Sequence, residues 1–217
     1  KQGDHYVPER FLRASDFVKG MGEANNPEWK TVAYDESSGE IVVPKGSVGF
    51  RWGEKGKWSL EEKASGNQET RLRLSLSEIK DGISAVGVPY IGNREHDHFA
   101  GTDHPDVLKR NVPTKTLQLP EGETVVASVF DLFLANYGVD RGFGGENIGK
   151  NYDDLQPYTP AWAEKISGVP RDQIITVARE FALNAEKTGG RSMVILGAGL
   201  NHWYHMDMNY RGIINML

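Results

Sequence analysis

Cysteine is absent from the 217 residues of this sequence. Its absence excludes, within this chain, disulfide bonds, thiolate zinc sites, iron–sulfur ligation and a cysteine nucleophile. Any redox chemistry must therefore use a cofactor that other ligands hold. The lack of cysteine is also typical of proteins in a reducing compartment.

Long apolar runs and an excess of basic residues are missing too. No run approaches the roughly 18 apolar residues that span a bilayer, and no signal peptide is visible. Lys and Arg number 25 against 30 Asp and Glu, which gives a net charge of −5. Because binding to nucleic-acid phosphates needs a basic patch, we expect no nucleic-acid partner, and we expect no direct insertion into a membrane.

The composition that is present is globular, with 38% hydrophobic and 25% charged residues. At roughly 150 residues per domain, this length corresponds to one or two domains. The sequence begins at Lys1 without a methionine and stops at Leu217 within an apolar helical pattern. Domain boundaries are usually polar and flexible, so we expect an internal fragment of a longer polypeptide.

Residues 191–217 carry the strongest pattern in the sequence. An apolar run at 192–196 lies between glycine pairs and predicts a strand buried on both faces of a parallel sheet. A Gly-x-Gly turn follows at Gly197 and Gly199. Apolar residues then recur at steps of three and four and predict a helix over 206–217.

Such a junction is typical of an anion site, because glycines admit a close backbone approach and helix N–H groups favour phosphate. This one lacks the third glycine of the dinucleotide fingerprint, so a purely structural turn is the alternative. The side chains favour a pocket wall, since five consecutive amide, imidazole and aromatic groups can all form hydrogen bonds. These are Asn201, His202, Trp203, Tyr204 and His205.

The C-terminal half predicts three further helices. One covers 128–137 and ends at Gly138, one covers 161–166 after an N-cap at Thr159, and one runs from Pro170 to about residue 185. Together with the strand at 192–196, they give an αβα order that predicts a Rossmann-like portion over about 127–217. The four glycines of 141–151 resemble a phosphate loop but lack its context, so we expect a flexible connection there.

The N-terminal half predicts a helical lead-in over 1–26, with an amphipathic helix at 7–20, and a β-rich insertion over 27–126. Within the insertion we expect hairpins at 31–34/40–43 and 115–119/123–126, and a half-buried strand at 71–76. Its aromatic residues favour a small core over a nucleic-acid platform, and its His-Asp segment favours an exposed loop over a metal site. These two groups are Trp29, Phe50, Trp52 and Trp58, and His96, Asp97, His98, Asp103 and His104. The overall class expected is α/β, as an incomplete part of a larger multidomain subunit.

Four long segments carry a family resemblance. They are GAGLNHWYHMDMNYRGIINML (197–217), YTPAWAEKISGVPRDQIITVAREFA (158–182), NNPEWKTVAYD (25–35) and GSVGFRWGEKGKW (46–58). They resemble the catalytic alpha subunits of membrane-bound respiratory nitrate reductases, in the molybdopterin oxidoreductase superfamily. The resemblance covers most of the chain and is least evident over 61–115.

The resemblance implies a molybdenum-bis(molybdopterin guanine dinucleotide) cofactor in the full-length parent, which would reduce nitrate to nitrite by oxygen-atom transfer in anaerobic respiration. It implies cofactor contacts for Gly197, Gly199, Leu200, Asn201, His202 and Tyr204. His202 is the candidate catalytic residue and His205 the alternative, since an imidazole can hydrogen-bond an oxyanion as charge builds. Either histidine can equally be a hydrogen-bonded core residue.

The resemblance also implies that some cofactor ligands lie outside this chain and that the parent has partner subunits. The iron–sulfur ligands and the aspartate ligand of molybdenum lie outside it, so we expect no metal ligand here and an inactive isolated fragment without bound cofactor. Expected partners are an iron–sulfur beta subunit, which the insertion would help to dock, and a membrane cytochrome b gamma subunit. The expected location is the cytoplasmic side of the bacterial membrane. The alternatives are a non-catalytic interaction module and a self-sufficient guanine-nucleotide domain.

Overall fold

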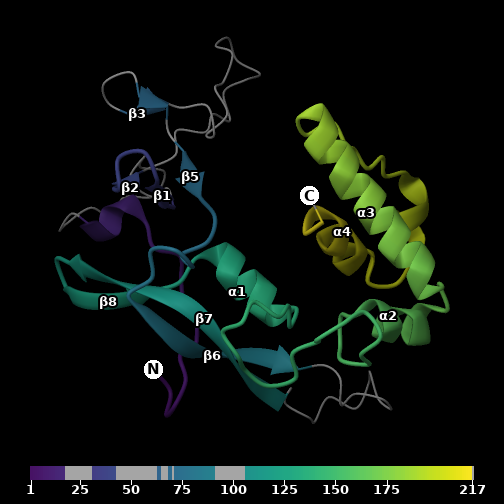
Figure 1. Cartoon of the computed structure of the whole chain (residues 1–217), viewed down its shortest axis with the longest axis horizontal. Coiled ribbons are helices and arrows are strands. Elements are labelled where there is room, and N and C mark those ends of the chain that lie inside the picture. The colour runs from purple at the N-terminus through teal and green to yellow at the C-terminus, as the bar shows by residue number, and fades with distance from the viewer. Residues whose placement is uncertain (18–30, 43–62, 65–67, 70, 91–105, 217) are drawn as a thin grey trace. The chain divides into compact units, whose positions relative to one another are not determined.

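The computed structural model describes residues 1–17, 31–42, 63–64, 68–69, 71–90 and 106–216 (Figure 1). The chain divides into two compact units, Lys1–Ile166 and Ser167–Leu217. The described residues form four α-helices and small antiparallel sheets, so the class is mixed α/β.

The first unit is built on a three-stranded antiparallel sheet in the order β6-β7-β8. Its strands are β6 (Gly82–Tyr90), β7 (Asp106–Leu119) and β8 (Gly122–Val126). The hairpin predicted at 115–119/123–126 is confirmed by the β7–β8 pairing, and Gly122 turns it with φ +131°. The sequence predicted neither β6 nor the first nine residues of β7, 106–114.

Strand β7 pairs with β6 along one edge, and its other edge has two partners in succession. The Asn111 N–H donates to the Gly144 carbonyl at 3.1 Å, so a loop covers this edge. From Lys115, which pairs with Val126, β8 takes over. Pro113 lies on the same edge between these two partners, and it has no N–H to leave unpaired. A proline is therefore compatible with the centre of this sheet.

Helix α1 (Val129–Asn136) packs on the sheet and closes the core, whose buried apolar residues are Val86, Val88, Leu108, Val112 and Ala135. Ser128 caps the helix by accepting from the Asp131 N–H at 3.0 Å, and Gly138 ends it with φ +67°. The helix predicted at 128–137 is confirmed, and it ends at Gly138 as expected.

A second small sheet has the order β2-β1-β5. Strands β1 (Ala33–Asp35) and β2 (Ile41–Val42) confirm the first predicted hairpin. The strand predicted at 71–76 is limited to β5 (Leu72–Arg73). The chain leaves the sheet there because Ser75 and Leu76 donate to Asp131 instead, at 2.7 and 2.8 Å. A separate pair joins β3 (Lys63–Ala64) to β4 (Gln68–Glu69).

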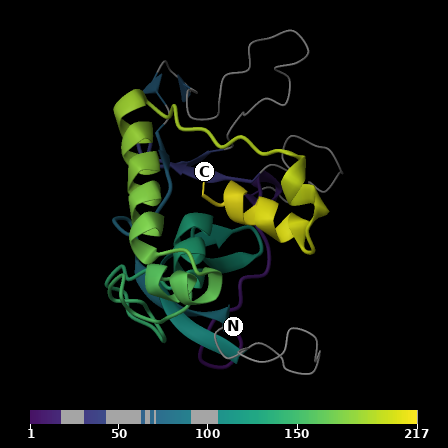
Figure 2. The same cartoon turned by 90° about the vertical axis from the view of Figure 1, so that its right-hand side faces the viewer.

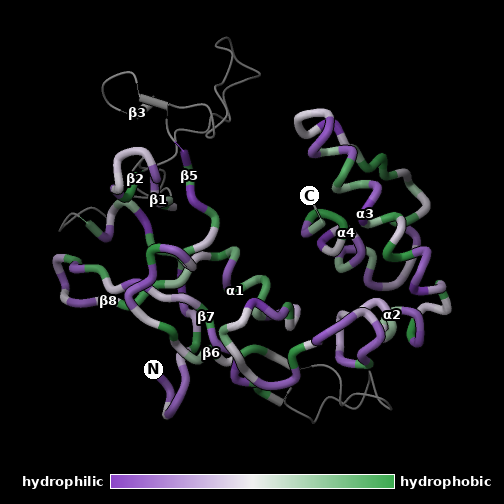
Figure 3. The backbone as a smooth tube through the Cα atoms, in the orientation of Figure 1, coloured by the Kyte–Doolittle hydropathy of each residue, from purple (hydrophilic) through white to green (hydrophobic). Residues whose placement is uncertain are grey.

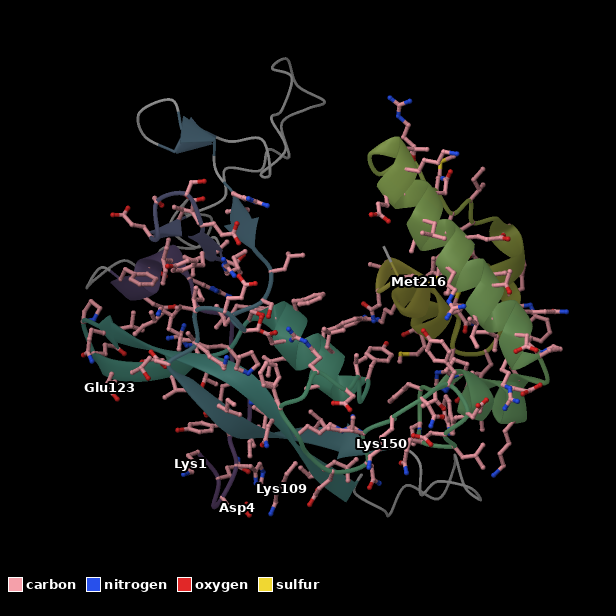
Figure 4. All side chains as sticks on the ribbon, viewed as in Figure 1. Lys1, Asp4, Lys109, Glu123, Lys150 and Met216 are labelled. Carbon is pink, nitrogen blue, oxygen red and sulfur yellow. The ribbon has the colours of Figure 1, made fainter. Side chains whose placement is uncertain are left out.

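The helix predicted at 7–20 is wrong for its described residues, which contain only the 3-10 turn η1 (Ala14–Phe17). Within this range the backbone pairs with another segment, since Leu12 O accepts from the Val32 N–H at 3.4 Å and Arg13 forms an antiparallel bridge with Thr31. Just before it, the Tyr6 N–H donates to Ala85 O of β6 at 2.8 Å, and Tyr6 O accepts from the Gly87 N–H at 2.9 Å. An ion pair between Asp4 and Lys109 adds a tie to β7 (Figure 4). The hydrogen bond from Lys109 lowers the pKa of Asp4 to about 2.

Helices α2 (Pro160–Ser167) and α3 (Arg171–Thr188) are confirmed where the sequence predicted them. Thr159 caps α2 by accepting from the Trp162 N–H at 3.2 Å. Gly189 ends α3 in the left-handed region with φ +66°. Hydrophobic and hydrophilic stretches alternate along α3 (Figure 3).

The strand predicted at 192–196 does not form. The segment leaves α3 as coil and leads to η5 (Ala198–His202) and α4 (Met206–Ile214), which confirms the predicted C-terminal helix (Figure 2). A strand needs a neighbouring strand for its backbone N–H and C=O groups, and the described residues offer none beside it. Met193 and Ile195 are 75% and 82% exposed. A Rossmann-like fold is therefore not confirmed.

Candidate functional site

The predicted site residues lie together on η5 and on the turn that leads into α4. Gly197 precedes η5 in an extended conformation (φ −111°, ψ 178°), and Gly199 lies inside it. A Cβ added to either glycine would meet no atom within 4 Å. Nothing in the described chain therefore requires these glycines, and the backbone between them is open to approach from outside.

His205 lies between η5 and α4. It adopts the left-handed conformation (φ 56°, ψ 35°) as the N-cap of α4, which is uncommon for any residue other than glycine. Its carbonyl oxygen accepts from the Met208 N–H at 3.0 Å and starts the helix. Its ring lies 3.9 Å from that of Tyr204. Strained backbone of this kind concentrates at functional sites.

The other side chains of the segment are exposed. Trp203 and Tyr204 are 73% and 77% exposed, and Asn201, His202 and His205 are exposed as well. Neither histidine is a buried core residue in this structure. Aromatic groups this accessible are more typical of a binding surface than of a tight structural turn.

Tyr210 is the residue of this site that the sequence did not predict. It lies on α4 and is partly buried, and its hydroxyl donates to the side-chain oxygen of Asn201 on η5. The helical spacing of Tyr210 assigned it to an apolar face. Only the turn at His205, which brings α4 back against η5, reveals the contact.

Two polar clusters of the first unit are structural. Asp131 is fully buried and accepts hydrogen bonds from Ser75, Leu76, Ser128 and Arg141. Burial alone would raise the pKa of Asp131, but the hydrogen bonds from Leu76, Arg141 and the two serines outweigh it and hold the pKa below its usual value. A carboxylate with this many protein partners has no free lone pair directed at a ligand.

Arg110 is the centre of the other cluster, and it is only 2% exposed. Its guanidinium donates to Ala135 O at 2.7 Å and Asn136 O at 3.0 Å, the last carbonyls of α1. It also donates to Glu146 O at 3.0 Å and Asn147 O at 2.8 Å in the glycine-rich loop. The loop expected to be a flexible connection is thus tied to α1 and β7.

The aromatic group of the insertion and the segment 96–104 lie outside the described residues. In the parts that are described, no group of three or more His, Asp or Glu residues is placed to hold a metal ion. Within the same parts, no helix has the length and apolar character needed to cross a membrane.

Comparison with known proteins shows which proteins this chain is similar to. No family model matches it. Among individual proteins, the matches at high identity are alpha chains of nitrate reductases, over 98% to 100% of the chain. The family resemblance of the four sequence segments is therefore confirmed, and the chain is homologous to nitrate reductase alpha chains.

Three relatives illustrate the match. The respiratory nitrate reductase 2 and 1 alpha chains of Escherichia coli (strain K12) are 60% identical over 213 residues and 56% identical over 215 residues. The nitrate reductase alpha chain of Bacillus subtilis (strain 168) is 39% identical over 219 residues. In each case the chain spans only 17% of the relative's length.

Proposed function

We propose that this chain forms part of a molybdenum-dependent nitrate reductase alpha subunit, which reduces nitrate to nitrite by oxygen-atom transfer in anaerobic respiration. The observation that carries the proposal is the similarity to such subunits over the whole chain. The chain's own contribution is one wall of the cradle for molybdenum-bis(molybdopterin guanine dinucleotide). The exposed segment 197–205 forms that wall.

The residues of this wall fit such a group. Gly197 and Gly199 leave the backbone open, so a bulky cofactor can approach without meeting a Cβ. Leu200, Asn201 and Tyr204 add one apolar and two hydrogen-bonding side chains on the same segment. When bound, the molybdenum centre supplies the electron pair and takes the oxygen atom that nitrate loses.

His202 is the residue proposed to act on the substrate. Its exposed imidazole donates a hydrogen bond to a nitrate oxygen and stabilises the negative charge that builds there. His205 is the alternative, because it lies three residues further on in the same exposed turn. Neither histidine is proposed as a metal ligand.

The wider assignments belong to the same proposal. Segment 192–196 becomes a buried strand of a Rossmann-like portion, 127–217, when the rest of the subunit supplies neighbouring strands. Residues 27–126 are a β-rich insertion that helps to dock the iron–sulfur beta subunit, and 1–26 lead into it. A membrane cytochrome b gamma subunit anchors the complex to the cytoplasmic side of the membrane.

The test is made in the full-length parent, with a reduced viologen as electron donor. His202→Ala should lower nitrate turnover at least about 100-fold while the molybdenum content stays unchanged. His205→Ala is the parallel variant, and the larger loss identifies the residue that faces the substrate. A parent that contains no molybdenum and reduces no nitrate would refute the proposal.

A second candidate function is a non-catalytic interaction module with a structural Gly-x-Gly turn. The exposure of Trp203 and Tyr204, at 73% and 77%, favours it, because aromatic side chains are enriched in interfaces. It predicts unchanged turnover for both histidine variants.

A further inference from the structure

We infer that Tyr210 orients the side-chain amide of Asn201 so that its N–H groups face a phosphate or pyrophosphate oxygen of a bound nucleotide. The inference rests on the proposed function, and it assigns Tyr210 as a positioning residue that acts through Asn201. Residues 201–209 are exposed, whereas Tyr210 is partly buried. The tyrosine is therefore turned towards its own unit, where its hydroxyl meets Asn201.

The chemistry of an amide gives this contact a direction. Asparagine has one acceptor oxygen and an NH₂ group with two donors. The Tyr210 hydroxyl donates to the oxygen, so the acceptor side of Asn201 is partly occupied by the protein. Among the described residues, no hydrogen bond engages the NH₂ group of Asn201. The Tyr210 hydroxyl takes one of the two lone pairs of the oxygen, and the two N–H donors remain for an acceptor-only ligand group such as a phosphate.

The surroundings of Asn201 suit an anion as well. Residues 197–206 contain no carboxylate, and His202 and His205 both carry ring N–H donors. The open backbone at Gly197 and Gly199 lets a ligand approach the same segment. Asn201, His202 and His205 are exposed, and Asn201 lies two residues after Gly199 in the same segment.

The left-handed turn at His205 makes the contact possible. Asn201 and Tyr210 are nine positions apart, on two different helices that pack against each other. The left-handed residue (φ 56°) lies in the short connection between those helices. The backbone conformation of His205 therefore has a role that does not depend on its imidazole, because it places Tyr210 beside Asn201.

The test measures how fast the full-length parent loses guanine nucleotide on incubation, with molybdenum content as a second readout. Asn201→Ala should speed the loss about tenfold, since a hydrogen bond to a charged group is removed. Tyr210→Phe removes only the hydroxyl and should speed the loss about threefold. Asn201→Asp keeps the shape but presents a negative acceptor to the phosphate, and should lower occupancy more than Asn201→Ala does.

A double variant separates positioning from general destabilisation. If Tyr210 acts through Asn201, Tyr210→Phe in an Asn201→Ala background should add no further loss. Additive effects would mean a merely structural tyrosine and would overturn the inference. Tyr6→Phe removes a hydroxyl in the first unit and is the matched control, with an unchanged rate of loss expected.

The outcomes distinguish the two proposals. A wild-type parent that holds molybdenum and guanine nucleotide, but whose Asn201 and Tyr210 variants retain them normally, overturns this inference alone. A wild-type parent that holds neither overturns the proposed function and this inference with it. If Asn201→Asp does not accumulate, the cycle of Asn201→Ala and Tyr210→Phe decides the question without it.

Discussion

Asp131 joins three separated parts of the first unit at one carboxylate. Ser75 and Leu76 come from the segment after β5, Ser128 from the cap of α1, and Arg141 from the glycine-rich loop. The sequence predicted a helix that begins at Ser128 but gave no sign of the contacts at Ser75 and Arg141. These partners lie 56 and 10 positions away, and no local pattern encodes them.

Replacing Asp131 with Asn should destabilise the first unit by about 3 kcal/mol, because Arg141 would lose its buried counter-charge. Hydrogen exchange of the α1 amides in the purified protein would report the change as faster exchange. Glu121→Gln, in the exposed turn before β8, is the control. Equal exchange in the two variants would contradict the role given to Asp131.

The same carboxylate predicts a pH dependence. The folded-state pKa of Asp131 lies below its ordinary value, which is about 3.9 in an unfolded chain. Its stabilisation is therefore fully present above about pH 4 and is lost as pH falls through the folded-state pKa. Exchange of the α1 amides, corrected for the intrinsic effect of pH, should speed up over that range more in the wild type than in Asp131→Asn, which keeps the contribution of other acidic groups such as Asp35.

Arg110→Lys should cost about 3 kcal/mol in the first unit, although charge is conserved. A lysine has three donors on one nitrogen and cannot reach carbonyls on both α1 and the loop. Faster amide exchange at both the end of α1 and residues 144–147 is the expected measurement. Arg71→Lys is the matched control: its side chain is 81% exposed and paired with Glu36, where an exposed ion pair contributes at most about 1 kcal/mol.

At the scale of elements, the four helices of the C-terminal half were predictable, whereas the helix expected at 7–20 does not form in its described residues, and β6 and most of β7 were not predicted. Helices α1, α2 and α3 carry their end signals locally, at Ser128, Gly138, Thr159 and Gly189. Strand β7 carries Arg110 and Pro113, which usually mark a surface and a strand end. Arg110 fits because carbonyl groups of α1 and the glycine-rich loop accept its hydrogen bonds, and Pro113 fits because it lies between two partners of the same strand edge. A short window of sequence cannot show such contacts.

The apolar run at 192–196 shows the opposite error. Its composition predicts a buried strand, but composition cannot supply the neighbouring strands on which pairing depends. The arrangement of the candidate site was not predictable for a similar reason. Its residues were recognisable as a group, whereas the Tyr210–Asn201 contact depends on the backbone of His205 and was not recognisable.

The pairing of the N-terminal segment with β6 depends on Gly87. A Cβ at this position would lie 2.8 Å from the His5 ring and 2.9 Å from a Val107 methyl group. Gly87→Ala should therefore displace residues 1–7 at a cost of about 1–2 kcal/mol. Limited proteolysis should show faster cleavage there than in Gly212→Ala, where no atom lies within 4 Å. Unchanged cleavage would mean that the segment adapts without leaving β6.

At the scale of the whole molecule, the two units differ in their cores. The first has a cluster of buried apolar residues between its sheet and α1. In the second, none of the described residues is buried, and large apolar side chains such as Met193, Ile195 and Trp203 are more than 70% exposed. Burial of apolar surface is the main stabilising contribution to a fold, so the second unit lacks its own source of stability.

Residues 167–217 produced alone should consequently show no cooperative unfolding transition. Partial helicity from α3 is expected, since isolated helices of this length are marginal in water. Circular dichroism during heating should give a gradual, non-sigmoidal loss of signal, whereas residues 1–166 should give a sigmoidal one. A sharp transition in the shorter piece would show that it holds a core absent from this structure.

Pro113 has a final consequence for how the first unit reaches its native pairing. If β7 shifted by two positions relative to its neighbours, Pro113 would lie opposite a carbonyl group that needs an N–H donor. Asn111 would then lie where no carbonyl group accepts its N–H. Pro113 therefore disfavours a shift in the register of β7. Insertions or deletions of two residues in this strand, which would preserve the alternation of its faces, should still be rejected because the hydrogen-bond ladder can close in only one alignment.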